Sequence, residues 1–177
     1  MSRISVQPTA AERIRPLPGD DRIAADVVMD RACTVPGTPE QVWPWLVQLG
    51  KQRAGWYLPR SVERLLPRRA LRRIEPRWQQ LAVGDVIPDY GGKNETFTLV
   101  ELADEQHLVY WSQRGSVQLT WAIVLSPHRY GTRIQFRLRL APVRRRWLAE
   151  YGGGFFDWLT IAGLAAGLSE RLAAWQL

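Results

Sequence analysis

The sequence predicts an α+β domain in which a curved antiparallel sheet of about six strands is covered by one long helix at the C-terminus. The first observation behind this prediction is strict alternation in two neighbouring strand-like segments, which gives each one apolar face. The second is the segment 157–175, where apolar residues recur at helical spacing after a run of three glycines. The alternating apolar residues are Leu119, Trp121, Ile123 and Leu125, and then Ile134, Phe136, Leu138 and Leu140.

The chain is expected to begin with an arm, residues 1–22, followed by a single domain, residues 23–177. The arm is polar, contains several prolines and has no apolar period, so it is expected to be either loose or wrapped over the surface. Residues 26–35 form the first predicted strand, in which Arg31 interrupts an otherwise apolar face.

A helix is predicted directly after this first strand. Thr38 is a suitable N-cap, Pro39 fits the first helical position, and Gln41 completes a capping box. Gly50 is a plausible stop, whereas Pro44 should kink or shorten the helix because it lacks a backbone N–H. Residues 61–66 form a second short helix, so a helix pair is expected between the first two strands.

Five further strands are predicted beyond this helix pair, and short turns join them into a meander. The face of the last strand that carries Arg133, Gln135, Arg137 and Arg139 is expected to lie in water. The C-terminal helix is expected to cover the opposite, apolar face, and the space between the two can be a ligand cavity. The five strands are residues 86–90, 96–102, 107–113, 117–126 and 132–141.

Several of these segments also resemble a known superfamily. VPGTPEQVWPWLVQLGKQRAGWY (residues 35–57) resembles the opening of SRPBCC-superfamily proteins, the START-like and polyketide cyclase-like helix-grip proteins. RIEPRWQQLAVGDVIP (residues 73–88), TWAIVL and GTRIQFRLR are similar to later parts of the same pattern, so the resemblance covers roughly residues 26–140. It implies the helix-grip fold. It implies no single activity, because the superfamily includes lipid carriers, hormone receptors and a few enzymes.

The chain is strongly basic, with a formal net charge of +7, and arginine supplies 22 of its 24 basic residues. A basic cluster of this kind can bind nucleic acid or an anionic membrane. The interleaved Glu63 and Glu75 and the absence of a groove-reading motif favour a solvated surface, so no specific nucleic-acid partner is expected. The cluster comprises Arg60, Arg64, Arg68, Arg69, Arg72, Arg73 and Arg77, together with Arg144, Arg145 and Arg146.

Other classes of site are not indicated. Cys33 is the single cysteine, so no internal disulfide can form and a cytoplasmic location is the simplest expectation. No signal peptide and no membrane-spanning segment is recognisable. His107 and His128 lack partners at metal-ligand spacing, so neither a metal nor a cofactor is expected.

The sequence therefore predicts binding or carriage of a small, mostly apolar, lipid- or polyketide-like ligand, with no catalytic residue assigned. Two alternatives stay open: an enzyme of the polyketide cyclase or dehydratase kind, and a basic surface adaptor for RNA or anionic lipid. Such an enzyme would need a polar group facing the cavity, for which Arg31, Tyr90 and Gln113 are candidates. Oligomeric state is left open. Structural packing is the favoured alternative for any single tryptophan, and capping of helix carbonyls is the alternative for Arg53. The residues predicted to contact the ligand are Arg53, Trp56, Tyr57, Tyr90, Trp111, Trp121, Phe136 and Trp158.

Overall fold

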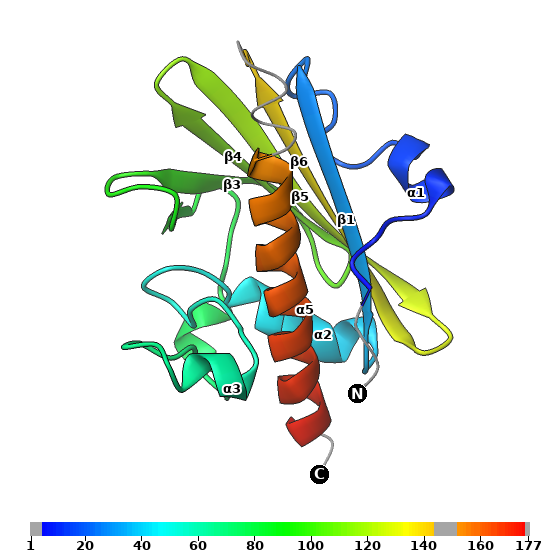
Figure 1. Ribbon diagram of the computed structural model, residues 1–177, viewed down its shortest axis with the longest axis vertical. Helices are drawn as coiled ribbons and strands as arrows, with labels where there is room; N and C mark the ends of the chain where they lie inside the picture. Colours follow the sequence, from blue (N-terminus) through cyan, green and yellow to red (C-terminus); the bar gives the residue numbers. More distant parts are fainter. Residues whose placement is uncertain (1–4, 144–151, 176–177) are drawn as a thin grey trace.

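A computed structural model of the chain describes residues 5–143 and 152–175. Its centre is a six-stranded antiparallel sheet with strand order β1-β6-β5-β4-β3-β2, which confirms the predicted α+β class (Figure 1). Each strand from β2 to β6 pairs with the next one along the chain, as a meander requires, and β1 joins the sheet beside β6. The strands are β1 (Val27–Val35), β2 (Val86–Pro88), β3 (Thr96–Ala103), β4 (His107–Arg114), β5 (Val117–His128) and β6 (Gly131–Ala141).

The register places the alternating residues as the sequence predicts. Trp121 of β5 lies opposite Leu138 of β6 on one side and Tyr110 of β4 on the other. Residues directly opposite one another share a face, so these three side chains lie on the concave face of the sheet. Cross-strand neighbours thereby assemble one continuous apolar surface.

The helix pair after β1 consists of α2 (Pro39–Val47) and the short α3 (Arg60–Glu63). At the start of α2, the backbone N–H of Thr38 donates to the Gln41 side chain at 3.0 Å, as in the predicted capping box. The helix runs through Pro44 and ends three residues later, at Val47. A short 3₁₀ helix, η1 (Pro76–Trp78), precedes the sheet meander.

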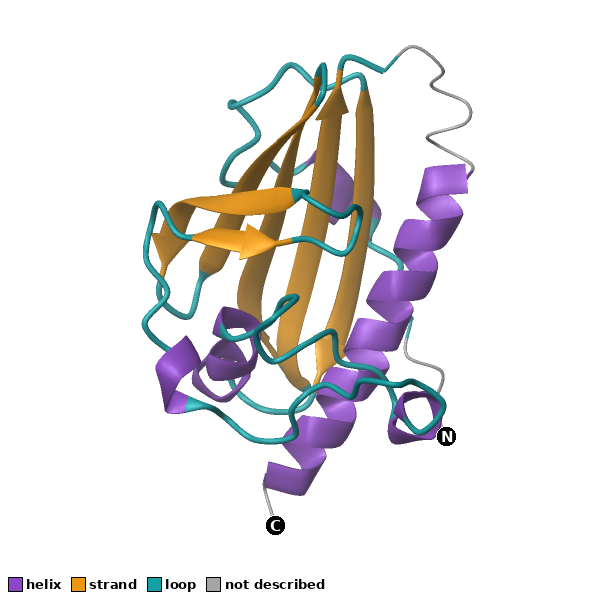
Figure 2. Cartoon of the chain, turned by 90° about the vertical axis from the view of Figure 1, so that its left-hand side faces the viewer, coloured by secondary structure: helices purple, strands orange, loops and turns teal. Residues whose placement is uncertain are grey.

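The long C-terminal helix, α5 (Gly154–Trp175), runs along the concave face of the sheet (Figures 1 and 2). Arg171 of α5 forms a buried ion pair with Glu63 of α3 at 2.5 Å, which ties the two helices together. Gly167 allows the chain at Leu58 to approach closely, because an added Cβ would lie 2.5 Å from the Leu58 backbone. The apolar side chains that α5 buries are Ile161, Leu164, Ala165, Leu168 and Leu172.

The convex face of the sheet is partly covered, so the prediction that this face of β6 lies in water was wrong. Gln135 and Arg137 of β6 are only 1% and 4% exposed, because the N-terminal arm lies over them. The arm contains the helix α1 (Ala10–Ile14), and the Arg137 guanidinium donates to the backbone carbonyls of Glu12, Arg13 and Arg15 at 2.9–3.0 Å. Of the two possibilities for the arm, loose or wrapped over the surface, its described part is wrapped over the surface. Polar side chains of β6 are covered by the chain's own carbonyl and carboxylate oxygens.

Arg137 is the centre of this contact. Its guanidinium also pairs with Asp30 of β1 at 2.8 Å and with Asp20 of the arm at 2.6 Å. A buried charge is tolerated only when it is paired and its N–H groups have acceptors. The five oxygen partners of Arg137 meet that requirement and join the arm to the first and last strands.

Within the described residues, no helix has the length and apolar character needed to cross a membrane. The same part of the chain holds no group of three or more histidine, cysteine or acidic residues arranged to bind a metal ion.

Candidate ligand-binding cavity

A cavity of about 880 Å³ lies between the concave face of the sheet and α5. The sheet supplies apolar side chains to its wall, and the first two turns of α5 supply the opposite side. Loops near residues 51–58, 66–71 and 89–91 complete the wall. Cavities that bind small molecules commonly measure about 300–1,000 Å³ and are mostly apolar, so this one has a suitable size. The lining residues from the sheet include Met29, Phe97, Leu119, Trp121, Leu138 and Leu140, and those from α5 are Phe156, Asp157, Thr160 and Ile161.

The floor of the cavity is aromatic. The Trp121 ring stacks against Trp56 with centroids 6.0 Å apart, against Tyr110 at 5.9 Å and against Phe136 at 6.3 Å. Three of these rings meet because neighbouring strands place them on one face, whereas Trp56 arrives from the loop after α2. The Trp56 indole N–H donates to the Thr160 carbonyl of α5 at 3.2 Å, which fixes that ring between helix and sheet. Of these rings Trp56 and Trp121 line the cavity, so they offer an aromatic surface to a planar or conjugated ligand, while the buried Tyr110 and Phe136 support Trp121.

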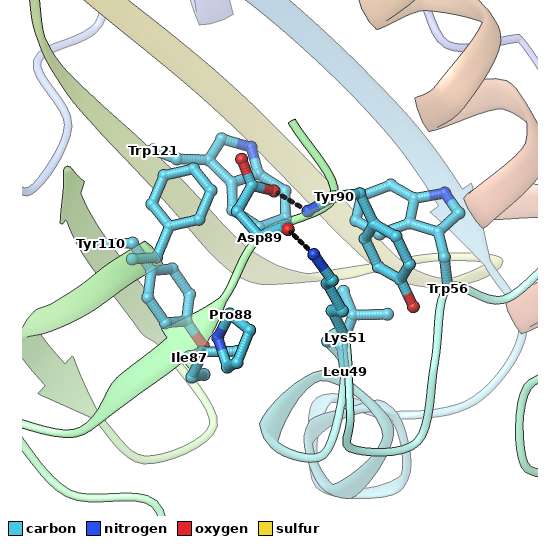
Figure 3. Close-up of a pocket in the computed structure, with 11 residues that line it drawn as sticks. Leu49, Lys51, Trp56, Ile87, Pro88, Asp89, Tyr90, Tyr110 and Trp121 are labelled. Carbon is cyan, nitrogen blue, oxygen red and sulfur yellow. Dashed lines mark hydrogen bonds between the residues drawn. The ribbon is translucent and has the colours of Figure 1, made fainter. Parts of the chain in front are cut away.

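A small recess of about 40 Å³ adjoins this floor (Figure 3). The residues that it shares with the larger cavity are Lys51, Trp56, Asp89, Tyr90, Phe97 and Trp121. The Lys51 ammonium donates to the Asp89 carbonyl at 2.8 Å, and the Tyr90 backbone N–H donates to the Asp89 carboxylate at 2.7 Å. These bonds hold the loop after β2 against the loop after α2. The recess therefore has fixed walls and extends the main cavity by about the volume of a small substituent.

The sequence allows two roles for Arg53, in the loop after α2: contact with an anionic ligand group, or capping of helix carbonyls. Its guanidinium donates to the carbonyls of Val47 and Trp78 at 3.0 Å each, and it lies over the Trp78 ring at 4.8 Å. The capping interaction is thus present. Arg53 also lines the cavity, so contact with a ligand stays a prediction.

Three of the other predicted ligand residues line the cavity together with Arg53: Trp56, Tyr90 and Trp121. Phe136 lies behind Trp121 as part of the buried core. Tyr57 is buried too, and its hydroxyl donates to the Trp45 carbonyl at 2.8 Å, so it supports the end of α2.

The remaining two predicted ligand residues are not brought to the cavity. Trp111 lies opposite Thr98 and Thr120 in the register and therefore points to the convex face. Trp158 is exposed on α5, where it stacks on Phe155 with centroids 6.0 Å apart. Of the polar candidates for an enzyme, Tyr90 lines the cavity, and Arg31 lies opposite Phe136 on the concave face of the sheet. Gln113 is exposed on the convex face.

Asp157 is one of several polar groups in the wall that the sequence reasoning missed. It lies in the first turn of α5, and its carboxylate is 3.1 Å from the Arg31 guanidinium of β1. Arg31 also donates to the Gly154 carbonyl at 2.7 Å, which anchors the start of α5 to the sheet. The signal available in the sequence was Arg31 itself, a charged residue on an otherwise apolar strand face that needs an acidic partner.

Burial raises the pKa of Asp157 to about 6, because the apolar wall disfavours the carboxylate form. The Arg31 charge opposes this rise and Asp30 adds to it. The cavity therefore contains one carboxyl group that changes its protonation state close to neutral pH.

This shift predicts a pH-dependent difference in stability between the wild type and Asp157→Asn. A pKa of about 6 in the folded state, against 3.8 in the unfolded chain, means that the folded state retains the proton in this window. The favourable contribution is present below about pH 4 and is lost as pH rises through 6. The free energy of unfolding of the wild type, relative to Asp157→Asn, should fall by about 2 kcal/mol between pH 4 and pH 7. Urea titrations of both proteins across this range measure it, and a difference that is independent of pH would contradict the assignment.

Comparison with known proteins supports the fold. No family model matches the chain, and no curated protein matches it. Among solved structures, it is similar to a protein from Rhodobacter sphaeroides with a TM-score of 0.58 and 16% identity, over 97% of this chain and 98% of that one. A protein from Nitrosomonas europaea has a TM-score of 0.54 and 20% identity, over 87% of this chain and 99% of that one. A protein from Mesorhizobium loti has a TM-score of 0.51 and 19% identity, over 85% of this chain and 98% of that one. Likeness at these identities shows the fold alone, and with the curved antiparallel sheet around α5 it gives the chain a helix-grip fold.

Proposed function

We propose that the chain binds a small, mostly apolar ligand, lipid- or polyketide-like in character, in the cavity between the sheet and α5. The observation that carries this proposal is the cavity itself, about 880 Å³ with predominantly apolar walls. Protein interiors are normally close-packed, and apolar voids reduce stability in proportion to their volume. A space of this size between the two main layers of the fold is therefore best explained by a ligand that fills it.

The features of the wall support the same proposal. Trp121 and Trp56 present stacked rings, and Leu119, Leu138 and Leu140 add aliphatic surface on the sheet side. Burial of apolar ligand surface against such walls supplies the main driving force for binding. A reducing cytoplasm remains the compartment that we propose, because Cys33 is a buried free thiol.

An enzyme of the polyketide cyclase or dehydratase kind is the second candidate, and Asp157 is the observation that favours it. A carboxyl group with a pKa of about 6 can act as a general base or acid near neutral pH. It lines the same cavity that would hold a reactive chain in one conformation. Turnover of a bound polyketide-like compound, lost in Asp157→Asn while binding remains, would distinguish the enzyme from the carrier.

The adaptor alternative gains no such support. Arg72 pairs with Glu63 at 3.0 Å, and Arg73 pairs with Glu75 at 3.3 Å, so part of the basic cluster is neutralised within the chain. Residues 144–146, which complete the cluster in the sequence, lie outside the described residues.

Leu138→Trp tests the carrier proposal. Leu138 lines the cavity from β6, and an indole at this position should occupy the volume that a ligand needs. The variant should fold, because the added side chain enters existing space, and it should bind the apolar fluorophore N-phenyl-1-naphthylamine at least about tenfold more weakly than the wild type. Fluorescence titration measures the affinity, and thermal melting checks the fold.

Val28→Trp is the matched control, since Val28 is 45% exposed on the convex face of β1. It should leave the affinity for the fluorophore within about twofold of the wild type. A wild type that binds no fluorophore, or a Leu138→Trp variant that binds it unchanged, would overturn the proposal.

A further inference from the structure

We propose that the cavity selects ligands that carry an anionic end group, and that Arg68 and Arg69 bind this group at the cavity mouth. The inference rests on the proposed function and specifies its ligand class: an apolar body that ends in a carboxylate, sulfonate or phosphate. The charged residues around the cavity provide the starting point. They are five cations, Lys51, Arg53, Arg68, Arg69 and Arg114, and two anions, Asp89 and Asp157.

Three of the five cations are already engaged by the protein. Lys51 donates to the carbonyls of Asp89 and Gly92, and Arg53 donates to those of Val47 and Trp78. Arg114 pairs with Asp89, and it lies 3.7 Å from Glu95. These three side chains therefore hold loops in place through their hydrogen bonds and ion pairs.

Arg68 and Arg69 are different. Across residues 5–143 and 152–175, neither side chain has a carboxylate within ion-pair distance or a hydrogen-bond acceptor, although Arg72 and Arg73 just beyond them both have acidic partners. Both are exposed, yet both also line the cavity, so they stand where its interior meets solvent. Paired guanidinium groups at such a rim can bind the oxygens of an anionic group through charge-assisted hydrogen bonds.

The second charged end of the cavity gives the ligand a direction. Asp157 lies in the first turn of α5, whereas the loop that carries Arg68 and Arg69 is tied to the last turns through Arg171, which donates to the Leu71 carbonyl at 2.8 Å. Asp157 and Arg171 are 14 positions apart, which corresponds to about 21 Å along the helix. A carboxylate on the ligand would be attracted by the unpaired rim arginines, whereas the other end of the cavity holds Asp157, whose partner Arg31 is already engaged by it. The anionic end therefore faces the rim, and the apolar body lies over Trp121.

Two fluorophores with the same aromatic body test this inference. 8-Anilino-1-naphthalenesulfonate carries a sulfonate, and N-phenyl-1-naphthylamine is its neutral counterpart. In the double variant Arg68→Gln/Arg69→Gln, the affinity for the sulfonate should fall roughly tenfold at low ionic strength, and that for the naphthylamine should stay within about twofold. Thermal melting of the variant verifies that it is folded.

Arg60→Gln/Arg64→Gln is the matched control, because it removes the same net charge from exposed arginines at the start of α3 and just after its end, neither of which lines the cavity. It should leave both affinities within about twofold. An equal loss in this control would indicate a general field effect, and an equal loss of both fluorophores in Arg68→Gln/Arg69→Gln would indicate a change in the shape of the mouth. Either result overturns the inference, as does unchanged sulfonate binding. If the wild type binds neither fluorophore, the proposed function itself fails.

Discussion

A chain that lacks residues 154–177 is expected not to fold cooperatively. Ile161, Leu164, Leu168 and Leu172 of α5 are all buried, and burial of each such side chain contributes about 1.5–3 kcal/mol. Their combined contribution, about 6–12 kcal/mol, is comparable to the entire stability of a typical domain. The truncation also removes Arg171 and leaves its partner Glu63 without its buried counter-charge. Circular dichroism during urea titration should show no cooperative transition, and size-exclusion chromatography should show aggregation.

A pair of point variants on the same helix separates packing from chain length. Leu164→Asp places a charge in the core and should approach the effect of the truncation, whereas Leu159→Asp, at a position that is 52% exposed, should change stability by less than about 0.5 kcal/mol. A monomeric truncated chain that melts cooperatively would show that α5 is an appendage of an independently stable sheet.

Arg137→Ala is expected to destabilise the protein by about 3–5 kcal/mol, the range found when one partner of a buried ion pair is removed. The substitution leaves Asp30 buried without its guanidinium partner, and it removes the hydrogen-bond donors that three arm carbonyls accept. The free energy of unfolding from urea titration measures the loss. Hydrogen exchange should additionally show faster exchange in residues 5–23, because Arg137 holds that segment to the sheet.

Arg64→Ala is the control for this prediction. Arg64 is exposed just after α3, and its removal should cost less than about 0.5 kcal/mol. If Arg137→Ala behaved like this control, the arm would be held by its other contacts, among them the Glu12–Arg133 ion pair at 2.7 Å and the buried side chains of Val6 and Leu17.

The sequence predicts the sheet and α5 well because their side chains repeat with a regular period. In β5 and β6 apolar residues recur at every second position over 119–125 and 134–140, so both the strands and their inner face follow from the pattern. The prediction that the convex face lies in water was wrong for a physical reason. Periodicity reports that Gln135 and Arg137 point away from the apolar face, but it does not report that an aperiodic arm covers them.

The cavity residues also divide into those that the sequence period predicts and those that it does not. Trp121 could be placed on the inner face because β5 alternates, but β4 carries the unbroken run Leu108, Val109, Tyr110 and Trp111, in which no alternation identifies the inward residues. Trp111 was therefore predicted to contact the ligand although it points outward. Asp157 was missed because an acidic residue in the first turn of a helix is common at exposed positions. Its burial depends on contact with β1, which the local sequence does not encode.

The position of β1 beside β6 also has a consequence during synthesis on the ribosome. β1 ends at Val35 and its partner strand in the described sheet, β6, begins at Gly131, which is 96 positions later (131 minus 35). At about 5–20 residues per second, β1 waits roughly 5–20 s for the strand that completes its hydrogen bonds. An unpaired strand edge is a template for pairing with other chains during that interval. The arm limits this hazard only after folding, when the Val6 carbonyl accepts the Ala32 N–H at 3.1 Å along the outer edge of β1. Nascent chains are therefore expected to depend on chaperones between the emergence of β1 and that of β6.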